Sequence, residues 1–337
     1  MVQATGLVLK RTKVWWDAAR WMALPQSAMP CLVAGLIAFY HGLFDPVRFL
    51  VTFIGLMAVH LGTNLLDDYA DLKIAGFSVR NELQQAGDIV RTTKAPHVVN
   101  GTIKLNHVLY VSLGLFTVGI MACVYLAVVS GWPVAAIATG GAFICFFYSM
   151  PPLSLCYRGM GEAAVAVSMG PMICVGTYYA VAQCFSWELL LLSIPIGILI
   201  ALILYVHSIM DFKPDLKVKK TTLVAILGSQ QKAILLLPVL FVIAYGVIIA
   251  GVVLNVLPLT ALIILLTLPL AIKLVQLMRQ LGRGDYGDIK RTWWMGPMEK
   301  GMGEGMDWFM VRWYLARNLM ISTTLLIFVA YGSALAF

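Results

Sequence analysis

Residues 51–71 read VTFIGLMAVHLGTNLLDDYAD, an apolar run that ends in three aspartates within five positions. The apolar part is typical of a segment that crosses a lipid bilayer. Carboxylates at the edge of such a segment are costly to place there, and they usually serve a function. The stretch therefore predicts a membrane helix with a functional cluster of negative charge at its end.

The composition supports a membrane protein. The chain has 337 residues, of which 61% are hydrophobic and 12% charged, and its mean hydropathy is +0.87. Soluble domains carry about 25% charged residues, so this chain lacks the polar residues that a soluble surface needs. We therefore exclude a soluble multidomain protein and expect an all-α, polytopic membrane protein.

The apolar segments long enough to cross a bilayer define the expected architecture. We expect one domain over residues 1–337, with nine transmembrane helices around a central cavity. We expect an interfacial segment, 1–24, before the first helix. We also expect a long cytoplasmic loop, 278–314, before the last helix. The expected spans are 25–44, 47–66, 107–129, 132–150, 162–184, 188–209, 232–254, 257–277 and 315–336.

The positive charges predict the orientation. All Lys and Arg residues except Arg48 fall in the N-terminal segment, in the loops after the second, fourth, sixth and eighth spans, or at their edges. Cytoplasmic loops collect Lys and Arg, so we expect a cytoplasmic N-terminus. The net charge of +8 would then lie mainly on the cytoplasmic face of the protein. Such a face is suited to binding anionic lipid headgroups or phosphorylated substrates rather than nucleic acid.

A second acidic motif follows the sixth span. Asp67 and Asp71 belong to a DxxxDLK pattern that Asp211 and Asp215 repeat. Residues at i, i+3, i+4 and i+7 share one helical face. Two faces result, each with a polar residue beside its carboxylates: Asn64, Asp67, Asp68 and Asp71 on the first, and Ser208, Asp211 and Asp215 on the second.

Carboxylates this close repel one another unless a cation lies between them. Mg²⁺ is a suitable cation, because it takes one or two carboxylates and uses substrate phosphates for its other positions. Two acidic faces across one pocket could hold a diphosphate through Mg²⁺, with basic side chains gripping the same oxygens. The candidates for that grip are Arg80, Arg91, Lys94, Lys219 and Lys220.

Two other interpretations compete with this one. A lone DDYAD could be solvated loop charge, but two such motifs on one side favour function. A cation-coupled transporter would place carboxylates near the middle of the membrane, whereas the interiors of these spans are almost free of Asp and Glu.

The motifs resemble the UbiA-type superfamily of intramembrane aromatic prenyltransferases. NLLDDYAD and DFKPDLKVKKTT are similar to the two Asp-rich motifs of that family, and YSMPPLSLCYRGMGE (148–162) is similar to its connection after the fourth helix. The resemblance implies that Asp67, Asp68, Asp71, Asp211 and Asp215 hold Mg²⁺. It adds Tyr148, Arg158, Glu162 and Ser208 as pocket or loop residues, with Arg158 and Glu162 as a pair that locks the loop. It also adds His97 to the candidates for binding the diphosphate, because relatives carry a basic residue in that stretch.

The resemblance is nearest to the 1,4-dihydroxy-2-naphthoate polyprenyltransferases of menaquinone synthesis, through ALPQSAMPCLVAG (23–35) and Tyr69. It implies a polyprenyl diphosphate and an aromatic acid as substrates, in a bacterial inner membrane with the site on the cytoplasmic side. The alternatives are other acceptors on the same fold: 4-hydroxybenzoate, haem, chlorophyllide or a glycerol phosphate. Ala75, Cys156 and Ser208 depart from the family pattern and leave the acceptor open.

Overall fold

A computed structural model describes residues 12–74, 83, 95–287, 289–298 and 306–334. Within these ranges, nine helical segments are long and apolar enough to cross a membrane, which confirms the predicted all-α membrane fold. The first half of the chain supplies four segments. The first joins the 3₁₀ helix η1 (Trp21–Ala23) to α2 (Pro25–Tyr40), and the other three are the single helices α3 (Pro46–Ile74), α6 (Leu105–Ser130) and α7 (Trp132–Ser149).

The second half of the chain supplies the other five segments. The fifth is composite and consists of α8 (Gly161–Val167), the π-helical turn η3 (Ser168–Met172) and α9 (Ile173–Ala182). The eighth joins the 3₁₀ helix η4 (Leu259–Thr267) to α14 (Leu268–Gly282). The remaining three are α10 (Trp187–Met210), α13 (Gln230–Val253) and α15 (Asp307–Ala334).

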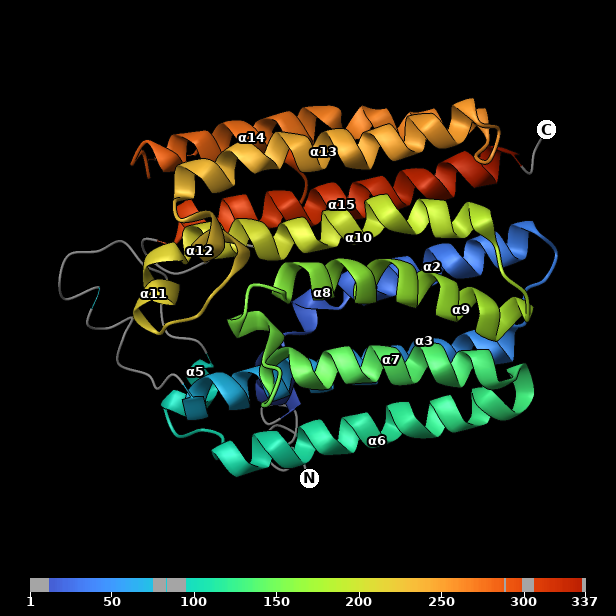
Figure 1. Cartoon of the computed structure of the whole chain (residues 1–337), viewed down its shortest axis with the longest axis horizontal. Helices are drawn as coiled ribbons and strands as arrows, with labels where there is room; N and C mark the ends of the chain where they lie inside the picture. The colour runs from blue at the N-terminus through green and yellow to red at the C-terminus, as the bar shows by residue number, and fades with distance from the viewer. Residues whose placement is uncertain (1–11, 75–82, 84–94, 288, 299–305, 335–337) are drawn as a thin grey trace, which may run out of the picture.

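Short helices collect at one end of the bundle. Figure 1 shows α5 (Pro96–Val99), α11 (Phe212–Lys217) and α12 (Leu223–Leu227) at the same end, on the left of the view. The 3₁₀ turn η2 (Leu155–Tyr157) follows α7. Both acidic motifs therefore end their helices on one side of the molecule, as the sequence predicted.

Three boundaries differ from the expected ones. Helix α3 continues to Ile74, so Asp67, Asp68 and Asp71 lie inside a helix rather than after it. The expected loop 278–314 is shorter, because α14 runs on to Gly282 and α15 begins at Asp307. Charged residues lower the mean hydropathy of these stretches, so the sequence placed the helix boundaries too early or too late. A helix with polar side chains can extend beyond the apolar core of the membrane.

Arg312 explains how α15 begins within the expected loop. Its guanidinium is buried and donates hydrogen bonds to the backbone oxygens of Leu277 (3.0 Å), Asp285 (3.4 Å) and Trp308. These three oxygens belong to α14, to the turn after it and to the first turn of α15, so one buried guanidinium joins all three segments. This contact fixes the end of α14 against the start of α15.

Two glycines bring the fifth and sixth spans into backbone contact. A Cβ atom on Gly170 would lie 2.6 Å from the Cα of Gly197, and one on Gly197 would lie 2.3 Å from the oxygen of Ala166. Small residues allow membrane helices to approach closely, and π turns often occur near functional sites. The contact positions the loop before α8 relative to the end of α10, where Asp211 lies.

We expect Gly197→Val to weaken this packing. Its side chain would overlap backbone atoms of Ala166, and overpacking of this kind costs about 1–3 kcal/mol. The measurement is the thermal midpoint of unfolding of the detergent-solubilised protein, which should fall. Gly246→Val in α13 is the matched control, because a Cβ at Gly246 meets open space. Equal midpoints for the two variants would contradict the packing argument.

Candidate active site

The three aspartates of α3 are held at the end of an apolar helix with little contact to solvent. Asp68 and Asp71 are 4% and 7% exposed, and the side chain of Asp67 is 14% exposed. Removing a carboxylate from water is costly unless a cation or hydrogen-bond donors compensate for it. Each of these aspartates has such a partner.

Arg20 is the cation beside Asp67 and Asp68. Its Nη1 lies 3.3 Å from Oδ2 of Asp67, and its Nη2 contacts Oδ1 of Asp68. Arg20 occupies a left-handed backbone conformation with φ of 55°, in the turn between the helical residues 12–18 and the 3₁₀ helix η1 (Trp21–Ala23). Arg20 belongs to the segment 1–24, for which the sequence predicted only an interfacial position. Its contact with Asp67 was not predicted, because no local pattern links residues 47 positions apart.

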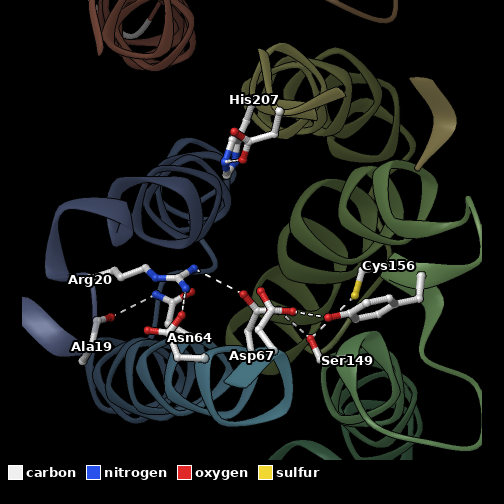
Figure 2. Close-up of polar contacts among 11 residues, drawn as sticks. Ala19, Arg20, Asn64, Asp67, Ser149, Cys156 and His207 are labelled. Atoms are coloured by element: carbon white, nitrogen blue, oxygen red, sulfur yellow. Dashed lines mark hydrogen bonds and ion pairs between the residues drawn. The ribbon is translucent and has the colours of Figure 1, made fainter. Parts of the chain in front are cut away.

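Asn64 supports the same turn. Its Nδ2 donates to the backbone oxygen of Ala19 at 3.0 Å, which fixes the residue next to Arg20. Figure 2 shows Arg20 and Asn64 on one side of Asp67 and Ser149 on the other. The first acidic motif thus joins the N-terminal segment to the end of α7.

The connection after α7 supplies hydroxyl donors to the same carboxylates. Ser149 Oγ donates to Oδ1 of Asp67 at 2.7 Å, and the hydroxyl of Tyr157 donates to Oδ1 of Asp71. Burial, together with the charge of Asp71, raises the pKa of Tyr157 well above its usual range, so its hydroxyl remains a donor. Burial also raises the pKa of the Cys156 thiol, to about 12.

The second acidic motif begins where α10 ends. Asp211 and Asp215 are 3% and 7% exposed, and a backbone hydrogen bond from Asp215 N to Asp211 O links them in one turn. His207 Nε2 lies 3.0 Å from Oδ2 of Asp211, and Phe309 of α15 packs edge-on against the His207 ring at 5.4 Å. Figure 2 shows His207 on a different helix from Asp67, in the upper part of the view.

Lys220 lies between the two motifs. Its Nζ is 5.0 Å from the centre of the Tyr157 ring, and the hydroxyl of that ring binds Asp71. Burial alone would lower the pKa of Lys220, but Asp71, Asp67 and Asp215 outweigh it and hold that pKa well above its usual range. Carboxylates of both motifs therefore act on one ammonium group, so the two acidic sets converge.

The loop that carries Lys220 is tied to the connection after α7. The backbone N–H of Thr221 donates to the backbone oxygen of Tyr157 at 3.2 Å. The backbones of Arg158 and Thr221 form a single parallel β-bridge. Lys220 itself donates its backbone N–H to the oxygen of Asp215 at 2.8 Å. These bonds hold the ammonium of Lys220 next to both acidic motifs.

Glu162 is buried beside Lys220 with one oxygen unsatisfied. Its Oε2 accepts a long hydrogen bond of 3.4 Å from the backbone N–H of Leu223, whereas Oε1 is buried without a hydrogen-bond partner among the described residues. A cavity of about 30 Å³ lies here, and Glu162, Tyr148, Ser208 and Asp211 are among the residues that line it. The expected pair of Glu162 with Arg158 is wrong, because Oε1 has no partner and Oε2 accepts its hydrogen bond from Leu223, while Arg158 is exposed.

The structure does not place the other predicted diphosphate-binding residues at the acidic motifs. Arg80, Arg91 and Lys94 lie outside the described residues. His97 lies in α5, and no contact between its side chain and the acidic motifs is found in the described part of the chain. Lys219 is exposed, with φ of 54°, in the turn that directs its neighbour Lys220 inward.

The donor set suits a magnesium ion better than a closed metal cage. In the ranges that the structure describes, no three His, Cys, Asp or Glu side chains form a group that could hold a metal alone. Mg²⁺ does not need such a group, because it is usually bound by one or two carboxylates and by substrate phosphates. Arg20 contacts two of the carboxylates that such an ion would bind, and Lys220 lines the same cavity as Asp211 and Asp215.

Comparisons with known proteins agree with this geometry. The UbiA prenyltransferase family matches residues 27–295. The 1,4-dihydroxy-2-naphthoate octaprenyltransferase of Bacillus subtilis is 28% identical over 71% of this chain and 75% of its own length. The 2-carboxy-1,4-naphthoquinone phytyltransferase of Synechocystis is 29% identical, over 62% of this chain and 67% of its own.

Solved structures share the fold. A UbiA homologue from Archaeoglobus fulgidus superposes with a TM-score of 0.56 at 13% identity, over 95% of this chain and 98% of that chain. One from Aeropyrum pernix gives 0.58 at 15% identity, over 89% and 97% of the two chains. The family match spans both acidic motifs and the connection between them, so this chain belongs to the UbiA prenyltransferase family and is an integral membrane prenyltransferase.

Proposed function

We propose that this protein is a Mg²⁺-dependent prenyltransferase that moves a polyprenyl chain from polyprenyl diphosphate to 1,4-dihydroxy-2-naphthoate, a step of menaquinone biosynthesis. The acidic end of the bundle faces the cytoplasm in this proposal, because the Lys and Arg residues gather there. The relatives named for that acceptor, in Bacillus subtilis and Escherichia coli, support the choice of ring.

One observation carries the proposal: Lys220 lies beside both acidic motifs. Its ammonium is 5.0 Å from the Tyr157 ring, whose hydroxyl binds Asp71, and it lines one cavity with Asp211 and Asp215. A diphosphate bound there would meet both acidic motifs through metal ions and the ammonium of Lys220 directly. The UbiA homologue of Archaeoglobus fulgidus, with the same fold, is described as bound to GPP and Mg²⁺. Asp67, Asp68, Asp71, Asp211 and Asp215 would hold the ions here.

The chemistry follows from these charges. Bound Mg²⁺ would neutralise the negative charge of the leaving diphosphate. Lys220 donates to the diphosphate oxygens, whose negative charge increases as the C–O bond to the prenyl carbon breaks. The aromatic ring attacks the resulting allylic cation, forming a C–C bond, and the ring carboxylate leaves as carbon dioxide. Because water would quench that cation, a buried site favours transfer to the ring.

Loss of one carboxylate in either motif should stop this reaction. We expect Asp68→Ala and Asp211→Ala each to lower the rate of prenyl transfer at least about a hundredfold, because the leaving charge loses compensation. The measurement is product formation by membranes given labelled geranylgeranyl diphosphate, Mg²⁺ and a panel of aromatic acids, identified by mass. A chelator should stop the wild-type reaction, and added Mg²⁺ should restore it.

Asp17→Ala is the control, since Asp17 is an exposed carboxylate three residues before Arg20. Near-wild-type activity of both motif variants, or turnover in the chelator, would remove the metal–diphosphate assignment. A product only with 4-hydroxybenzoate would keep the reaction and change the acceptor. No product with any acid would refute the proposed function.

The adjacent lysines give a matched pair of variants. Lys220→Met should raise KM for the prenyl diphosphate about tenfold to a hundredfold, because it removes a charge-assisted hydrogen bond. Lys219→Met should stay near wild type, since the side chain of Lys219 is exposed. Steady-state kinetics with varied diphosphate measure both, and equal effects of the two variants would contradict this role for Lys220.

Glu162 supports an acceptor that carries a free hydroxyl. An ionised carboxylate only accepts hydrogen bonds, so its unsatisfied Oε1 needs a donor. The adjoining cavity, of about 30 Å³, is large enough for one hydroxyl or water but not for a ring. The acceptor ring would therefore lie outside this cavity and direct one hydroxyl into it.

We expect Glu162→Gln to raise KM for the acceptor about tenfold, because its amide is a weaker acceptor and carries no charge. The Mg²⁺ dependence and KM for the diphosphate should not change. An acceptor with a methoxy group in place of the bound hydroxyl should react poorly with wild type and equally poorly with the variant. A shift in the Mg²⁺ dependence would instead identify Glu162 as a metal ligand.

A further inference from the structure

The connection between α14 and α15 carries two adjacent tryptophans that the proposed reaction does not use. The structure describes residues 289–298 of this connection, which we call the strap. Its 3₁₀ helix η5 (Trp293–Met295) leaves Trp293 92% exposed and Trp294 38% exposed. Neighbouring rings that point away from the core mark a candidate contact surface.

The turn of the strap is fixed against α15. Nδ2 of Asn318 donates to the backbone oxygens of Met295 (2.9 Å) and Pro297 (3.0 Å), and the side chain of Met295 is fully buried. Gly296 has φ of 84°, and a Cβ atom there would lie 2.8 Å from Nδ2 of Asn318. The outward position of Trp293 therefore belongs to a held turn.

The strap runs along α15 rather than staying beyond its end. Nη2 of Arg291 lies 2.7 Å from Oδ2 of Asp307, the first residue of α15. Asn318, which holds the turn, follows Asp307 on the same helix after a rise of about 16 Å. Trp293 thus lies well along α15, on the side of the bundle.

That depth is where the surface of α15 changes from polar to apolar. Arg317 is the last charged residue of the helix, and none of residues 318–334 carries a charge. The guanidinium of Arg317 lies 4.4 Å from the centre of the Tyr314 ring and 5.8 Å from that of Trp313. Aromatic residues beside the last charge of a span are typical of the boundary between lipid headgroups and hydrocarbon.

Positive charge surrounds the strap. In the described ranges 283–287, 289–298 and 306–307, the cations are Arg283, Lys290 and Arg291, and all three are exposed. The carboxylates in these ranges already have partners: Asp307 pairs with Arg291, and Oδ1 of Asp285 accepts a backbone hydrogen bond from Gly287 at 3.0 Å. Lys290 is therefore available to an anion beside the tryptophans.

We propose that the strap is a binding surface for anionic phospholipids, with Trp293 at the depth of the ester groups and Lys290 beside the phosphates. The leaflet is the one on the side of the acidic motifs, because Phe309, near the start of α15, packs against His207. Trp suits this depth, since its ring is apolar and its N–H can donate a hydrogen bond. A soluble protein partner fits less well, because lipid surrounds the bundle at that level.

Lipid selectivity tests the charged part of this surface. The thermal midpoint of the detergent-solubilised protein is measured with increasing phosphatidylglycerol or phosphatidylcholine, because a lipid that binds the folded state raises that midpoint. We expect tighter binding of phosphatidylglycerol by the wild type. Lys290→Gln should lower the affinity for phosphatidylglycerol about fivefold and leave that for phosphatidylcholine unchanged, since one Lys near an anionic surface contributes about this factor.

Lys104→Gln is the matched control, because Lys104 is an exposed lysine before α6, on the other side of the bundle from α14 (Figure 1). It should retain the preference of the wild type. Equal affinity of the wild type for the two lipids, or equal losses in the two lysine variants, would overturn the proposal.

Brominated lipids test the position of Trp293 directly. The wild type and Trp293→Phe are reconstituted in phosphatidylglycerol vesicles with bromine either near the headgroup or near the end of the acyl chain. The difference between their fluorescence emission reports Trp293, and we expect bromine near the headgroup to quench it more strongly. A difference emission that only aqueous iodide quenches would refute the proposal and favour a soluble partner. Neither measurement involves turnover, so the outcome is independent of the proposed function.

Discussion

Five carboxylates buried at the end of apolar helices are the constraint on which the site depends. Asp68, Asp71, Asp211 and Asp215 are each less than a tenth exposed, and close carboxylates repel one another. The protein compensates for this charge with Arg20 on one side and Lys220 between the motifs. The N-terminal segment, the connection after α7 and the loop after α10 each supply partners, so the acidic motifs organise the chain around them.

This arrangement also suggests how the site changes when substrate binds. Arg20 contacts Asp67 and Asp68, and Lys220 lies between the two motifs; in the proposed reaction both cations would turn to the diphosphate when metal enters. The carboxylates outnumber these two cations, so the site keeps an excess of negative charge that a divalent metal ion would offset.

The fold separates a polar reaction end from an apolar interior. The close approach of Gly170 and Gly197 fixes the fifth span against α10, which brings Glu162 next to Asp211 and Lys220. The looser packing of α6 and α7 leaves a large chamber beside α3. One end of the molecule thus carries the buried charges, and the part between the helices encloses an apolar cavity.

The sequence by itself determined the fold class, the number of spans and the presence of two related acidic motifs at one end. These properties depend on local features: hydropathy over about 20 residues, the helical spacing of Asp67, Asp68 and Asp71, and the uneven placement of Lys and Arg. The predicted helix boundaries were less accurate where a helix continues with charged residues beyond its apolar stretch, as at the ends of α3 and α14.

Only the tertiary structure decided which side chains meet. Arg20 reaches Asp67 and Asp68 from 47 and 48 positions away, and Lys220 rather than Lys219 turns toward both motifs. Glu162 retains an unsatisfied oxygen instead of pairing with Arg158. Contacts and cavities of this kind arise from how distant helices pack, and residue spacing along one chain carries no record of that packing.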